Sequence, residues 1–229
     1  MNDNRKHWLE KEDQLRGMLA TKSRFAEGMA LFLEQHAAVH SGAVCANTPW
    51  SLHDEVLHGL NDEQICHVAR PGQNSIAWVL WHITRIEDMT INLLTLEQQQ
   101  AWDDAWAGRL GISSADCGAS MDADEVAQLS THISVPALLA YRDAVGRRTR
   151  ESIQQLSHET AKQIVPNVRV QQLLQNGSIG PKAIWLYEYY LKRTRAFFLI
   201  RTATSHNFHH LYEAGRIKSR LIKIRPARD

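Results

Sequence analysis

Residues 74–100 read NSIAWVLWHITRIEDMTINLLTLEQQQ, and this stretch decides the fold. It follows Pro71-Gly72, and either Asn74 or Ser75 can cap a helix there, because their side-chain oxygens accept the free amides of a first turn. Apolar residues and one histidine then recur at steps of three and four, at Val79, His82, Ile86, Met89 and Leu93. The spacing predicts a long amphipathic helix that carries His82 within its apolar face.

Three further segments show a helical pattern. From Arg5 to about Gly42, apolar residues recur at three and four among good helix formers. Residues 136–156, PALLAYRDAVGRRTRESIQQL, begin with a proline that a first helical turn tolerates, and they carry one apolar stripe. From about Lys182 to Ile222 the chain has no proline, and Gly215 is its only glycine. We therefore expect four long helices.

The remaining residues connect these helices. A short helix is expected around residues 52–60, and weak periodicity predicts a long, partly helical excursion over residues 101–132. No segment alternates apolar and polar residues over the length of a strand. The predicted fold class is all-α, an antiparallel four-helix bundle with the excursion between the second and third long helices, and residues 1–229 are expected to form a single domain.

Composition and charge exclude several classes of protein. The 229 residues are 44% apolar and carry a formal net charge of +1, which argues against nucleic acid or an anionic membrane as a partner. No run of about 18 apolar residues is present, and the N-terminal stretch lacks the apolar core of a secretory signal. Cys45, Cys66 and Cys117 lack CxxC spacing, so neither a disulfide framework nor a thiolate zinc site is indicated, and a cytoplasmic location fits best.

Three histidines carry the predicted chemistry. His206 and His210 lie one turn apart on the apolar side of the fourth helix, a spacing that suits two imidazoles sharing one metal. His82 would supply the third ligand from a facing helix. Three protein ligands leave coordination positions open, so a bound divalent ion could activate water or a thiol. Neutral imidazole suits zinc, nickel, iron or copper, and no catalytic residue beyond the ligands is identifiable.

Other polar residues leave alternatives open. His209 lies one step off the stripe, and Glu213 is either a partner that orients a ligand imidazole or an ordinary surface acid. His36 and His40 are also spaced by four, but a cation-friendly helix C-terminus accounts for them without a metal. Glu87-Asp88 is expected to be solvated or at an interface. Several aromatic residues are expected either to line a pocket or to belong to the core or a subunit contact: Trp78, Trp81, Trp185, Tyr187, Tyr189 and Tyr190.

Two of these segments resemble the DinB-like superfamily, which includes the YfiT type. The capped helix with its tryptophan-histidine pair, Trp81-His82, is similar to the second-helix signature of that family, and residues 206–221, HNFHHLYEAGRIKSRL, are similar to its last-helix pattern. The resemblance implies that His82, His206 and His210 are the ligands. Tyr212 stands where the family commonly has glycine, so a shifted register that uses His209 and Glu213 stays open.

The resemblance also implies a function class. Better understood members are similar to thiol-dependent transferases, isomerases or hydrolases, and many are dimeric. The first hypothesis is a metal-dependent hydrolase or thiol-dependent transferase acting on an unidentified small molecule, with a low-molecular-weight thiol as a candidate partner. The alternative is a non-catalytic protein that binds a metal or small ligand, and a third hypothesis makes the histidines structural within a dimeric helical module.

Overall fold

The computed structural model describes residues 3–46 and 48–224, and these residues are overwhelmingly helical. No strand occurs in the described part of the chain, where the one pairing of the β type is an isolated bridge between Ile164 and Thr194. The all-α prediction is therefore confirmed.

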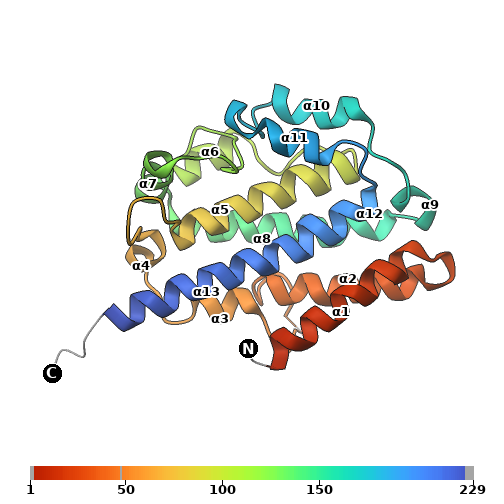
Figure 1. The fold of residues 1–229 in the computed structure, drawn as a ribbon, viewed down its shortest axis with the longest axis horizontal. Helices are drawn as coiled ribbons and strands as arrows, with labels where there is room; N and C mark the ends of the chain where they lie inside the picture. Colours follow the sequence, from red (N-terminus) through yellow and green to blue (C-terminus); the bar gives the residue numbers. More distant parts are fainter. Residues whose placement is uncertain (1–2, 47, 225–229) are drawn as a thin grey trace.

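The long helical elements run side by side (Figure 1). The first two are α1 (Asp3–Ala20) and α2 (Phe25–Val39). Next comes α5 (Ile76–Glu87), which continues into the π-helical segment η2 (Asp88–Thr95), and then α8 (Val135–Ser152). The last element starts as α12 (Arg195–Phe198), passes through the π-helical segment η5 (Leu199–Ser205) and ends as α13 (His206–Ile224).

The packing is compatible with the predicted bundle. Helix α5 contacts α8 and α13, while α2 contacts η5 and α13. Helices α5 and α8 run in the same direction, and α2 and α13 run opposite to both (Figure 1). The parallel pair arises because the excursion over residues 101–132 crosses back along the bundle before α8 begins.

The prediction of one helix over residues 5–42 is wrong, because the chain reverses at Thr21 and a short 3-10 turn, η1 (Lys22–Arg24). Helices α1 and α2 form an antiparallel hairpin in which the Gln35 side chain donates to the Trp8 carbonyl oxygen and the Trp8 indole donates to the Gln35 carbonyl oxygen. Helix periodicity continues on both sides of the turn and therefore does not reveal it.

The predicted fourth helix over residues 182–222 is also divided. Its first part forms η4 (Pro181–Ala183) and α11 (Ile184–Tyr190), and the chain then breaks at Lys192, which has a positive φ of 60°. Helix α12 restarts after Thr194, whose hydroxyl accepts from the Phe197 amide. The break is held by backbone hydrogen bonds from Val165 to Arg193 and from Arg195 to Gln163.

Short helices fill the connections. The expected short helix is α3 (Leu52–Leu57), followed by α4 (Asp62–Cys66). The excursion is partly helical as predicted, with α6 (Asp104–Leu110) and α7 (Ala123–His132). After α8 come η3 (Ile153–Gln155), α9 (His158–Ala161) and α10 (Asn167–Gln175). None of the described helices combines the length and apolar character needed to cross a membrane.

Gly28 sets the close approach of α1 and α2. A Cβ at this position would lie 3.0 Å from the Leu19 backbone nitrogen and from Met18 Cβ, whereas a Cβ at Gly17 would meet nothing within 4 Å. We therefore expect Gly28→Ala to lower the free energy of unfolding by about 1–3 kcal/mol through overpacking. Gly17→Ala, the matched control in the same hairpin, is expected to raise it by about 0.5–1 kcal/mol. Urea unfolding measures both, and equal effects would contradict the tight hairpin.

Candidate metal centre

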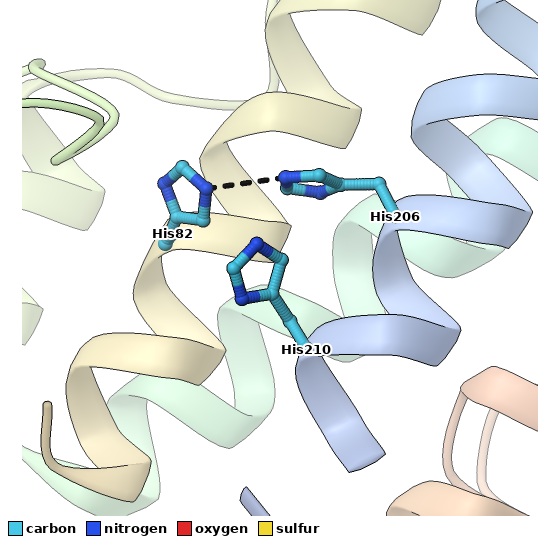
Figure 2. A group of neighbouring side chains, drawn as sticks. All are labelled: His82, His206 and His210. Atoms are coloured by element: carbon cyan, nitrogen blue, oxygen red, sulfur yellow. Dashed lines mark hydrogen bonds between the residues drawn. The ribbon is translucent and has the colours of Figure 1, made fainter. Parts of the chain in front are cut away.

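The three predicted histidines come together in the interior of the bundle. His82 projects from α5, and His206 and His210 project from successive turns of α13 toward it (Figure 2). Their candidate ligand atoms all lie within 4.8 Å of one another, and His82 Nε2 is 3.2 Å from His206 Nε2. The convergence that spacing predicted is therefore present.

Hydrogen bonds behind the rings orient two of the imidazoles. His82 Nδ1 lies 2.7 Å from the Cys117 carbonyl oxygen and must donate to it, which leaves Nε2 with a free lone pair. His210 Nδ1 lies 2.9 Å from Glu213 Oε2 and likewise donates. Asn74 in turn donates to the other Glu213 oxygen at 3.0 Å. Glu213 is therefore the hydrogen-bond partner of the His210 imidazole and not an ordinary surface acid.

The environment keeps the His82 and His206 rings neutral. Burial, followed by the nearby His210, lowers the pKa of His82 to about 4. Burial, followed by His82 and His210, holds the pKa of His206 well below its usual value. The hydrogen bond from His210 lowers the pKa of Glu213, so this carboxylate is ionised. At neutral pH His82 and His206 are therefore uncharged imidazoles, the form that binds metal.

The donor set fits a divalent metal. Zinc–imidazole bonds of about 2.0–2.1 Å in a tetrahedral site separate two ligand nitrogens by about 3.3 Å, close to the spacing of His82 and His206 Nε2. His206 Nδ1 has no hydrogen-bond partner within the described residues. Without a metal, His206 can therefore carry its proton on Nε2 and donate it to His82 Nε2. A cation would take the place of this proton between the two nitrogens.

His209 takes no part in this group. It is exposed, and its Nδ1 lies 2.7 Å from the carbonyl oxygen of Ser205 in its own helix. The shifted register that would use His209 and Glu213 as ligands is therefore not the arrangement in the structure.

Aromatic side chains enclose the centre. The Trp78 ring stacks on His82 with centroids 4.9 Å apart and an interplanar angle of 6°. A cavity of about 230 Å³ reaches His82 and His206, and Trp185, Tyr189 and Tyr190 line it. Trp185, Tyr189 and Tyr190 therefore line a pocket, which was one of the two expectations. Trp78 and Trp81 follow the other, since they belong to the buried core.

A second cluster lies deeper in the bundle, and it corrects two expectations. Glu87 is fully buried, as is Asp88, so neither is solvated. His36 and His40 are also fully buried and contact the two Glu87 oxygens through Nε2, at 2.9 Å each. These histidines do lie at the C-terminus of α2, as expected, but their rings bind the buried Glu87 carboxylate. The sequence did hold a signal for this cluster: His36 and His40 are spaced by four on one helix, and Glu87 is an acid within the apolar helix 74–100.

This second cluster is a hydrogen-bond network. Thr149 and Asn207 also donate to Glu87, at 2.8 Å each, so four donors occupy its oxygens. Burial lowers the pKa of His40 to about 3, so this ring is neutral and donates through Nε2. Binding metal through Nε2 would move protons of His36 and His40 to Nδ1, where neither ring has an acceptor among the described residues. In the first group two of the three imidazoles, His82 and His210, have acceptors behind them, whereas neither histidine of the second group has one. The first group is therefore the better candidate for a metal site.

Fold and site together define a helical-bundle protein with a three-histidine centre, in which His82 is buried and His206 and His210 are half-buried. The family model described as DinB superfamily matches residues 48–214, and all three histidines lie inside this match. The chain belongs to the DinB superfamily. None of the curated proteins compared with the chain matches it.

Glu87 is expected to be essential for stability. Burial alone would raise its pKa, but the adjacent imidazoles of His40 and His36, which also hydrogen-bond to it, hold the pKa of this carboxyl well below its usual range. Glu87→Gln would remove a buried negative charge and leave donors facing an amide. We expect the free energy of unfolding to fall by about 3–5 kcal/mol, measured with urea.

Glu151→Gln is the matched control, because Glu151 is an exposed acid on α8. It should change the free energy of unfolding by less than about 0.5 kcal/mol. A Glu87→Gln protein as stable as the control would contradict the role assigned to the network.

Proposed function

We propose that the chain binds one divalent metal ion through His82, His206 and His210. The observation that carries this proposal is the pair of acceptors behind the rings, the Cys117 carbonyl for His82 and the Glu213 carboxylate for His210. Each holds a proton on Nδ1 and leaves Nε2 directed at a shared point. Zinc, nickel and iron all suit such a donor set.

We further propose that the centre is catalytic, as a metal-dependent hydrolase or a thiol-dependent transferase. A divalent ion with three imidazole ligands lowers the pKa of water or of a thiol toward neutrality. The chain's own part is to hold the rings: Asn74 orients Glu213, Glu213 retains the His210 proton, and Trp78 packs flat on His82. The cavity beside His82 and His206 gives a small molecule room to approach.

The alternative function is a non-catalytic protein that binds a metal or a small ligand with the same residues. The cavity of about 230 Å³ favours the catalytic hypothesis, because a purely structural ion would not need space beside it. A homodimer, a low-molecular-weight thiol as partner and a cytoplasmic location remain predictions.

Metal analysis of protein purified without a histidine tag tests the ligand assignment. We expect one equivalent of metal in the wild type and loss of metal in His82→Ala and His210→Ala, because each substitution removes an imidazole donor. His209→Ala is the matched control from the same helix and should retain the metal, since His209 faces away. Glu213→Ala should weaken metal affinity by about 10- to 100-fold, because His210 would lose its orienting partner.

Undiminished metal in both His82→Ala and His210→Ala would end the proposal and leave the histidines with a structural role.

Product release from panels of esters and of thiol-plus-electrophile pairs tests catalysis. We expect turnover of at least one class, loss of turnover on chelation and recovery when the metal is returned. His210→Ala should be inactive and His209→Ala active. If the wild type holds its metal but turns over no member of either panel, the non-catalytic alternative is correct for these chemistries.

A further inference from the structure

A second and larger cavity lies on the other side of η5. It has a volume of about 470 Å³ and is walled by α1, the segment after α9, α12 and η5. We call it the α1–α12 cavity. The residues that matter for its chemistry are Arg16 and Leu19 from α1, Lys162, Phe197 from α12, and Ile200 and Arg201 from η5.

The rim of the α1–α12 cavity is strongly basic. Four basic side chains line it, Arg16, Lys162, Arg193 and Arg201, against the single acid Glu12. Arg193 is held in place, since its Nε donates to the Tyr189 carbonyl oxygen and its guanidinium lies over the Tyr189 and Phe197 rings. No ion pair or side-chain hydrogen bond is formed by Arg16, Lys162 or Arg201 with any other described residue. Three cations therefore line one cavity without an anionic partner among the described residues.

The floor of the cavity is apolar. Leu19 and Ile200 are buried beneath it, and Phe197 contributes an aromatic ring. An inorganic anion would leave this surface wetted, and a neutral apolar molecule would leave the cations unpaired. The chemistry that satisfies both is an amphipathic anion, with an apolar body on the floor and a carboxylate at the rim.

The position of Arg201 connects this cavity with the three-histidine centre. Arg201 lines both the α1–α12 cavity and the cavity that reaches His82 and His206. Ser205, which lines the α1–α12 cavity, immediately precedes His206 in the chain. Arg16 and Leu19 lie before residue 48, so this wall comes from a hairpin outside the family match.

We infer that the α1–α12 cavity binds an amphipathic carboxylate, held by Arg16, Lys162 and Arg201, next to the metal centre. That this carboxylate belongs to the substrate rests on the proposed function. The binding itself does not, because none of the three histidines lines this cavity.

Isothermal titration calorimetry of octanoate into chelator-treated, metal-free protein tests the binding. We expect saturable binding to the wild type, and binding of octanamide about tenfold weaker, because the amide has the same chain without the charge. Arg16→Gln, Lys162→Gln and Arg201→Gln should each weaken octanoate about fivefold. Arg70→Gln, an exposed arginine outside the cavity, is the matched control and should bind like the wild type.

Three results would overturn the inference: no saturable heat at millimolar octanoate, equal binding of octanoate and octanamide, or equal binding by the Arg201→Gln and Arg70→Gln proteins. Metal analysis of the same proteins separates the two proposals, since Arg201→Gln should keep its metal. A wild type that holds no metal as purified, and yet discriminates octanoate from octanamide, would refute the proposed function alone. Where an ester is turned over, Arg201→Gln should raise KM about fivefold for its carboxylate-bearing form.

Discussion

Donors from three helices converge on the carboxylate of Glu87 in α5, and the rest of the bundle depends on this buried charge. His36 and His40 reach it from α2, Thr149 from α8 and Asn207 from α13. A carboxylate removed from water is tolerated only when its oxygens are fully hydrogen-bonded, so none of these helices can slide without leaving a charge uncompensated. Arg142 supplies the opposite charge nearby: it donates to the Asn207 side chain and to the Val39 carbonyl oxygen, and although burial lowers its pKa to about 10, it remains a cation at neutral pH.

This network also determines where the three histidines lie. Glu87 and Asn207 are bonded to each other and stand on the same two helices as the three histidines, so their hydrogen bond sets the register of α5 against α13. Further hydrogen bonds cross the interface between the helix of α5 and η2 and the helix of η5 and α13. They join Thr90 to Thr202, His82 to His206, and Asn74 to Glu213. Because the α5–α13 interface is fixed at several levels, packing alone positions the imidazoles, which is the condition for a precise site. The π-helical segments η2 and η5 contact each other at this interface, and such segments are frequent at functional sites.

Sequence reasoning succeeded where spacing along one helix carries the information. The steps of three and four around His82, and between His206 and His210, state which side of each helix is buried, and the structure brings those sides together. Sequence reasoning failed where the structure depends on which residues meet across helices and not on the spacing along one helix. The same steps continue through the turn at Thr21, so they predicted one helix where there are two, and Glu87 carries no local sign that two histidines 47 and 51 positions earlier will meet it.

The sequence by itself determined the helical class, a cap for α5 at either Asn74 or Ser75, the histidines on the apolar faces and the resemblance to the DinB superfamily, since these follow from periodicity, capping chemistry and short motifs. The structure places the cap at Ser75. Only the tertiary structure decided which of the two histidine groups has acceptors behind its rings, and which charged residues border an apolar cavity. Those properties depend on contacts between segments far apart in the chain. Helical periodicity reports the burial of a face but carries no information about the atoms that the face meets.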